Sequence, residues 1–332
     1  MTDVLTELPV IDMALLDGGP DQRAAFGAAL RSATHQIGFF YLIGHGIDRA
    51  VRDRLFDTAR AFFALDQADK SAVEMLGSAQ FRGYTRFGGE YTDGGVDWRE
   101  QIDLGAEYPP LGHDPAYLRL DGPNLWPHGV PGFREVITDW QSRCSALGMQ
   151  LMREWALSLG AAADVFDDAF AHRPSTLLKL VKYPGSHEAD RQGVGAHKDP
   201  GVLTLLLVEP GKGGLEVESD GGWIDVPPVD DAFVVNIGEL MEFATEGYLK
   251  ATRHRVRSPA PGDVRLSVPF FFNPALASTM PRLELPAGLA AHARGITQDP
   301  DNVISGTFGD NLLKARLRAH PDVAARHHAD LL

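Results

Sequence analysis

The amino-terminal half of the chain places its hydrophobic residues mainly at helical spacing. Apolar side chains recur at a period close to 3.6 over residues 21–36, and the same period is sustained over 133–159. The second segment predicts the longest helix of the protein. Four shorter helices are predicted: one after Asp48, one after Asp66, and two over 161–170 and 310–318.

From Leu177 onward the pattern changes to short runs rich in Val, Leu, Ile and Phe, each bounded by turn residues. Seven such runs are predicted to be strands, at 177–183, 202–208, 215–218, 223–226, 233–237, 253–257 and 264–272. Short strands in close succession are typical of an antiparallel sandwich or barrel. We therefore expect a β-dominated α+β protein, with a double-stranded β-helix (jelly-roll) core and a helical N-terminal region packed against it.

Two stretches outside these elements shape the predicted organisation. The aromatic run at 39–43, closed by glycines, predicts a buried strand, whereas the glycine-rich stretch 81–108 predicts a loop with at most one strand. No linker is long and polar enough to separate two mobile lobes. We expect one unit with four segments: a mixed helical region at 1–120, a helical support at 121–174, the jelly-roll core at 175–275 and a C-terminal extension at 276–332.

The composition excludes several classes of protein. The 332 residues include 35 glycines and 22 prolines, an excess that favours strands and turns over a helical bundle. No apolar run approaches the roughly 20 residues of a membrane-spanning helix. The net charge of -14 repels phosphate backbones. We therefore expect neither a membrane nor a nucleic-acid partner, and no obligate protein partner is evident.

Cysteine usage points to a reducing compartment. Cys144 is the only cysteine, so the chain forms neither an intrachain disulfide nor a cysteine-rich zinc site. It falls inside the predicted long helix with no base beside it, and we expect it to be a core residue. The expected location is the cytoplasm.

Candidate chemistry begins at His197-Lys-Asp199, which follows a glycine-flanked run. Residues i and i+2 of an extended segment point to the same side, so this imidazole and carboxylate can converge. His254, at the start of another strand-like run, is the candidate third ligand. Two histidines and one carboxylate on one face of a metal leave positions open for dioxygen and a second molecule, the arrangement of non-haem Fe(II) oxygenases. A lone His-x-Asp is more often structural, so the assignment depends on the residues that accompany it.

The strand predicted at 264–272 carries a second constellation. A period of two places Arg265, Ser267 and Phe271 on one face and leaves the other face wholly apolar. The planar fork of an arginine matches a carboxylate, and a serine adds one donor beside it. The alternative is that Arg265 faces solvent and Ser267 only fills the strand. Tyr183, at the end of the strand 177–183, is either a further donor or a packing residue.

In the order of these residues the chain resembles the isopenicillin N synthase-like family of non-haem Fe(II), 2-oxoglutarate-dependent oxygenases. The N-terminal half is also similar to that family at 8–12, 38–46 and 97–100, and the segment 311–321 resembles the C-terminal tail of bacterial members. The similarity therefore spans most of the chain in the family's order.

The resemblance implies three metal ligands and three contacts to 2-oxoglutarate, with dioxygen as the other reactant and no catalytic residue beyond the metal site. The implied Fe(II) ligands are His197, Asp199 and His254, and the implied 2-oxoglutarate contacts are Arg265, Ser267 and Tyr183. Plant members have an asparagine two places before the tyrosine, where this chain has Val181. That departure argues against a plant-hormone or flavonoid substrate.

Three further residues are candidate substrate contacts. Phe271 shares a strand face with Arg265, and Arg82 and Tyr84 lie in a glycine-rich loop able to close over the site. His45 and the pair His327-His328 are better explained as structural or exposed residues. The glycines at 211–214 sit between strands and lack the context of a phosphate-binding loop, so they predict a hairpin turn.

The predicted function is a dioxygenase that hydroxylates, desaturates or cyclises a small organic substrate, with release of succinate and carbon dioxide. Two alternatives stay open. The first is an iron-dependent oxidase of the isopenicillin N synthase type, in which Arg265 and Ser267 hold the substrate and 2-oxoglutarate is not used. The second is a non-catalytic β-sandwich that binds a small carboxylate, against which the complete set of three metal ligands argues.

Overall fold

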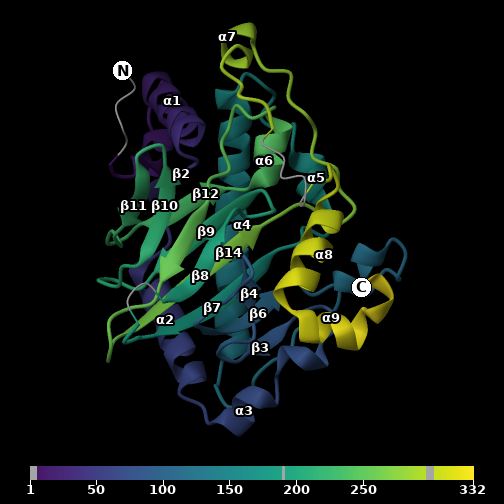
Figure 1. Cartoon of the computed structure of the whole chain (residues 1–332). Coiled ribbons are helices and arrows are strands. Elements are labelled where there is room, and N and C mark those ends of the chain that lie inside the picture. The colour runs from purple at the N-terminus through teal and green to yellow at the C-terminus, as the bar shows by residue number, and fades with distance from the viewer. Residues whose placement is uncertain (1–5, 189–190, 297–302) are drawn as a thin grey trace.

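Two largely antiparallel sheets pack face to face at the centre of the molecule (Figure 1). The computed structural model describes residues 6–188, 191–296 and 303–332. The larger sheet contains, in spatial order, β1 (Val10–Asp12), β2 (Phe39–Ile43), β12 (Phe233–Ile237), β9 (Leu203–Val208), β14 (Val264–Phe272), β7 (Leu177–Pro184), β6 (Glu100–Gly105) and β3 (Gly83–Thr85). The smaller sheet contains β11 (Gly222–Val226), β10 (Leu215–Ser219), β13 (His254–Arg257) and β8 (Gln192–His197), and a ribbon pairs β4 (Tyr91–Thr92) with β5 (Gly95–Val96).

Helices cover the outer face of the larger sheet. The longest, α4 (Phe133–Ser158), contacts β9 and β14, and α1 (Pro20–Gln36) and α2 (Arg49–Phe63) pack against it. The remaining helices are α3 (Gln67–Ser71), α5 (Asp167–Ala171), α6 (Glu239–Ala244), α7 (Ala287–Ala290), α8 (Phe308–Ala319) and α9 (Pro321–His327), with 3-10 turns at Met13–Asp17, Met75–Gly77, Ala116–Leu120 and Ala329–Leu331. Within the described residues, none of these helices is both long and apolar enough to cross a membrane. The predicted β-dominated α+β class with a jelly-roll core is confirmed.

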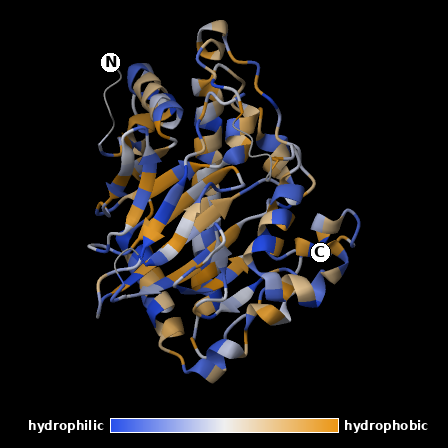
Figure 2. Ribbon diagram, viewed as in Figure 1, coloured by the Kyte–Doolittle hydropathy of each residue, from blue (hydrophilic) through white to orange (hydrophobic). Residues whose placement is uncertain are grey.

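Alternate side chains of each strand in the larger sheet point to opposite faces, one toward the helices and the other toward the smaller sheet. Hydrophobic and hydrophilic residues both occur along these strands (Figure 2). On β14, Leu266, Val268 and Phe270 belong to the main core, which includes Trp140 and Trp155 of α4. The opposite face meets the smaller sheet over a second, smaller core. Polar residues on that face therefore lie inside the jelly roll.

The N-terminal region contributes strands as well as helices. β1 and β2 extend one edge of the larger sheet, and β6 and β3 extend the other. The expectation of at most one strand over 81–108 is wrong, because four short strands lie there. Gln101 and Asp103 of β6 are almost fully buried inside the jelly roll, so the polar residues that obscured the hydrophobic pattern mark an interior face and not a loop.

β8 was also not among the predicted strands, since Gly193 and Gly195 have low strand propensity. A Cβ on Gly195 would lie 2.6 Å from the carbonyl oxygen of Thr92, and one on Gly193 would lie 3.0 Å from that of Val256. The glycines are needed because the ribbon and β13 approach this strand too closely for a side chain.

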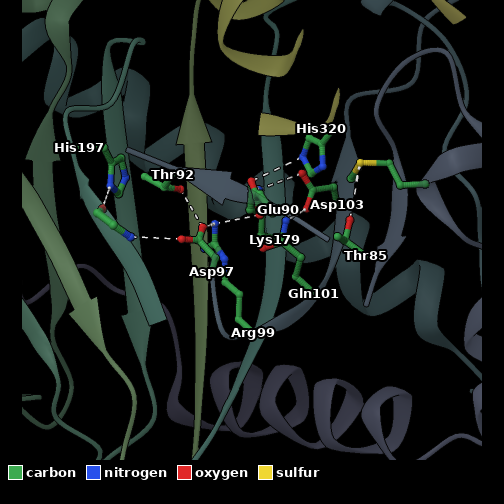
Figure 3. A network of polar contacts seen from close by, with 12 residues as sticks. Thr85, Glu90, Thr92, Asp97, Arg99, Gln101, Asp103, Lys179, His197 and His320 are labelled. Carbon is green, nitrogen blue, oxygen red and sulfur yellow. Dashed lines mark hydrogen bonds and ion pairs between the residues drawn. The ribbon is translucent and has the colours of Figure 1, made fainter. Parts of the chain in front are cut away.

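A buried network of charges lies inside the larger sheet (Figure 3), and Arg316 ties α8 to it. Lys179 on β7 contacts Glu90 at 3.0 Å and Asp103 at 3.2 Å. Glu90 also pairs with Arg99 at 2.8 Å, and Asp103 with Arg316 of α8 at 2.9 Å. Each of these charges has an opposite partner, so their burial is compensated. The contact to Arg316 holds α8 against the open end of the jelly roll.

His320, which follows α8, makes the stability of this region sensitive to acid. It is 1 % exposed, and its Nε2 lies 3.5 Å from Oε1 of Glu90. Burial lowers the pKa of His320 from 6.5 to about 4. Between these values the unfolded chain binds a proton that the folded chain does not, so the free energy of unfolding falls as the pH is lowered.

We therefore expect the free energy of unfolding to fall less steeply in the H320Q variant than in the wild type as the pH is lowered from 6.5 to about 4. Urea unfolding at stepped pH values measures this slope. The exposed His292 provides a matched control, H292Q, which should keep the wild-type slope. Equal slopes for all three proteins would show that His320 does not titrate in this way.

Candidate functional site

The open end of the jelly roll contains a cavity of about 750 Å³. Inward-facing side chains of both sheets line it, together with the segment around β4 and one side of α8. The predicted site residues that line this cavity are Arg82, Tyr183, His197, Asp199, His254, Arg265, Ser267 and Phe271.

The structure brings His197, Asp199 and His254 together, with one ligand atom of each within 4.8 Å of the others. Oδ1 of Asp199 lies 3.5 Å from Nε2 of His197 and 3.7 Å from Nε2 of His254. The two histidines are directly opposite each other on β8 and β13, and Asp199 follows β8 by two residues. Strand pairing and chain continuity therefore position the three side chains.

Backbone carbonyls set the orientation of both imidazoles. Nδ1 of His197 lies 2.8 Å from the carbonyl oxygen of Gly195, and Nδ1 of His254 lies 3.1 Å from that of Thr252. A carbonyl oxygen only accepts, so each Nδ1 carries the hydrogen and each Nε2 presents a lone pair to the centre. Gly195 in turn donates to Oδ1 of Asp97, which links this end of the site to the buried network (Figure 3).

Asp199 is oriented by two donors from the larger sheet. Its Oδ2 accepts hydrogen bonds from Oγ1 of Thr204 at 2.5 Å and from Nδ2 of Asn236 at 2.8 Å. Oδ1 is left to face the histidines. Sequence reasoning missed both donors, although a polar residue at an inward position of an apolar strand is the signal that would have found them.

Burial and mutual contact shift the pKa values of all three groups. Burial alone would raise the pKa of Asp199, but His254, His197 and Thr204 outweigh it and hold the pKa well below its usual value. Burial, with His197 nearby, lowers the pKa of His254 to about 4. Burial would lower the pKa of His197, but contact with Asp199 and the charge of that carboxylate outweigh it and raise the pKa, so metal binding displaces a proton from this ring. Two imidazoles and one carboxylate are a donor set that fits Fe(II) and leaves positions open for other molecules.

Arg265 has the properties of a carboxylate-binding residue. Its side chain is fully buried, and among the described residues none of its three nitrogens has a hydrogen-bond acceptor. The guanidinium lies 4.8 Å from the ring centroid of Tyr183, its partner on β7. Ser267 is two residues further along and 2 % exposed. Burial lowers the pKa of Arg265, and a carboxylate ligand would compensate that buried charge.

The structure corrects the expectation that Tyr84 contacts substrate. Tyr84 is not among the residues that line the cavity; its hydroxyl donates to Glu100 at 2.8 Å, and its ring packs against Phe62 in the main core. Arg82, two residues earlier, does line the cavity. The positive φ of Gly83, +112°, breaks the alternation that would put both side chains on one face.

Two families match this chain, in two separate parts. The family described as the 2OG-Fe(II) oxygenase superfamily matches residues 174–274. The family described as non-haem dioxygenase in morphine synthesis N-terminal matches residues 8–129.

Individual relatives are similar along most of the chain. The protein named 2-oxoglutarate-dependent dioxygenase frbJ, from Dothideomycetidae sp. (strain 11243), is 36% identical over 340 residues, covering 96% of this chain and 91% of that protein. Homoarginine-6-hydroxylase 2-ODD-C23.1 of Arabidopsis thaliana is 33% identical over 279 residues, covering 80% and 84%. The crystal structure of a full-length Neurospora crassa protein in complex with alpha-KG (2-oxoglutarate) and thymine matches with a TM-score of 0.76 and 25% identity, covering 99% and 98%.

These similarities extend over nearly the whole chain, and they agree with the grouping of two histidines and one aspartate in the cavity. The chain belongs to the 2OG-Fe(II) oxygenase superfamily and is an Fe(II)- and 2-oxoglutarate-dependent oxidoreductase.

Proposed function

We propose that His197, Asp199 and His254 are the Fe(II) ligands of this enzyme. The convergence of Oδ1 and the two Nε2 atoms carries the proposal. Thr204 and Asn236 hold the carboxylate, so the three ligand atoms keep their positions before the metal arrives.

We further propose that Arg265 and Ser267, with Tyr183, hold the distal carboxylate of 2-oxoglutarate. The unpaired buried guanidinium supports this assignment, since a carboxylate supplies the two acceptors that its fork lacks. Tyr183 packs beside the guanidinium and restricts where it lies.

When bound, the metal, 2-oxoglutarate and dioxygen supply the oxidising power, and 2-oxoglutarate leaves as succinate and carbon dioxide while the substrate is oxidised. The chain positions the reactants and excludes water. Phe271 and Leu177 contribute an apolar wall beside the metal group, and a small organic substrate fits the remaining volume of the cavity. Hydroxylation, desaturation and ring closure are all compatible with this arrangement.

Several finer assignments belong to the same proposal. The order of the site residues supports a place near the isopenicillin N synthase-like proteins, and the segment 311–321 supports a bacterial member. The family matches at 8–129 and 174–274 support the segment boundaries at 120 and 175. A single cysteine, fully buried, supports a cytoplasmic location. A cavity of about 750 Å³ and a net charge of -14 support a small-molecule substrate as partner, with no need for nucleic acid, a membrane or another protein.

The H197A variant tests the metal ligands. It should bind less than about a tenth of the iron that the wild type binds, by the loss of one of three ligands, and form no iron-dependent succinate. Anaerobic iron titration and succinate assays measure the two effects. H292A, which removes an exposed histidine, should behave as wild type. Normal iron content and activity in H197A would refute the ligand assignment.

The R265M variant tests the 2-oxoglutarate site. Loss of a charge-assisted hydrogen-bond pair worth about 1.5–3 kcal/mol should raise the 2-oxoglutarate concentration at half-maximal rate about 10- to 100-fold. S267A should raise it less, since a neutral donor is lost. R282M removes an exposed arginine paired with Glu246 and should leave the requirement unchanged. An unchanged requirement in R265M would mean that the cosubstrate carboxylate is held elsewhere.

A further inference from the structure

Besides Arg265, the same cavity contains one more buried guanidinium that has no partner among the described residues, that of Arg82, which 2-oxoglutarate does not use. Arg82 is 6 % exposed and lines the cavity. Among the described residues its side chain forms neither an ion pair nor a hydrogen bond, and its Nε is buried without an acceptor. A buried charge without a partner costs free energy, so the chain by itself does not explain why this arginine is there.

The carboxylates nearest to Arg82 are already engaged. Three of them raise its pKa by their charge, yet burial dominates and the pKa of Arg82 is lowered to about 10, so the group stays protonated at neutral pH. The three carboxylates and their partners are Asp103 with Lys179 and Arg316, Asp121 with Arg173, and Glu107 with Arg134. Arg82 is therefore the cation that this group leaves uncompensated.

Gly105, at the end of β6, makes room for the guanidinium. A Cβ at this position would lie 1.7 Å from Nη1 and 1.9 Å from Cζ of Arg82, so the guanidinium lies directly on the glycine backbone. Asn124 brackets that backbone, accepting from its N–H and donating to its carbonyl oxygen, both at 2.8 Å. The position of the guanidinium is built into the sheet and does not belong to a loose loop.

The strand register places this guanidinium across the sheet from the metal ligands. Gly105 is opposite Leu177 on β7, Leu177 is opposite Phe271 on β14, and Phe271 is opposite Thr204 on β9, which donates to Asp199. Three strand spacings of about 4.8 Å separate the ends of this row by about 14 Å. Leu177 and Phe271 line the cavity between them, so the connecting wall is apolar.

The two unpaired guanidiniums lie at different ends of the cavity. Arg265 is opposite Tyr183 on β7. Arg82 lies over Gly105, whose partner on β7 is Leu177, six residues before Tyr183. Six residues of a strand span about 20 Å, so one small dicarboxylate such as 2-oxoglutarate does not reach both.

We propose that Arg82 binds a carboxylate of the primary substrate, which is an elongated carboxylic acid with an apolar middle, oxidised at a carbon remote from the carboxylate. The inference rests on the proposed function, because it takes the His197, Asp199 and His254 group as the reacting end of the cavity. It adds the chemical class of the substrate and the residue that selects it.

A graded series of phenylalkanoic acids and their primary amides tests this proposal. Wild-type protein loaded with Fe(II) and 2-oxoglutarate is titrated anaerobically with each compound by calorimetry. The longer acids should bind about 10- to 100-fold more tightly than their amides, since only the acids pair with a guanidinium. Equal binding of acids and amides, or binding by none of the acids, overturns the proposal.

Variants assign the preference to Arg82. R82Q should reduce the acid-to-amide affinity ratio to near one, and R82K, which keeps the charge but not the fork, should retain part of it. R86Q removes an exposed arginine of the same segment that does not line the cavity and should keep the wild-type ratio. A wild-type ratio in R82Q overturns the assignment, and the wild-type series remains decisive if R82Q does not fold.

Succinate formation by the wild type, measured without a probe and with each acid of the series, separates this inference from the proposed function. If no succinate forms under any condition, the proposed function fails, while the comparison of acids with amides still tests Arg82. If succinate forms and acids bind no better than amides, the proposed function stands and the inference is wrong.

Discussion

Asp199 follows a strand of the smaller sheet but is held by the larger one. Thr204 on β9 and Asn236 on β12 both donate to its Oδ2, and Oδ1 is thereby turned toward two histidines that come from β8 and β13. A buried carboxylate without those donors would lack partners for half of its lone pairs. The geometry of the metal ligands is therefore coupled to the way the two sheets close on each other.

The interior of the jelly roll holds two kinds of buried cation. Carboxylates contact each of Lys179, Arg99 and Arg316, and these ion pairs link β6, β7 and α8. Arg265 and Arg82 have no such partners among the described residues. Compensated charges here stabilise the fold, and uncompensated ones are left for ligands, because a ligand carboxylate is the partner that the chain does not supply.

The elements that the sequence predicted well are those with a strong hydrophobic period. The strand at 39–43 has the predicted bounds, and the helix predicted at 133–159 ends one residue earlier, at Ser158. β6 was missed because its inward-facing residues are polar and belong to a buried charge network. β8 was missed because it contains glycines where neighbouring strands approach closely. The six-residue helix α6 was missed as well, since it is too short to show a helical period.

The sequence by itself determined the jelly-roll class, the order of the chemical motifs and the placing of His254 and Arg265 on strands, because these follow from strand period and residue chemistry. Only the tertiary structure decided which polar side chains meet. Tyr84 turned into the main core while Arg82 stayed in the cavity, and Thr204 and Asn236 became partners of Asp199. These contacts join different elements of the fold, so the way the strands pair in space, and not any local pattern, specifies them.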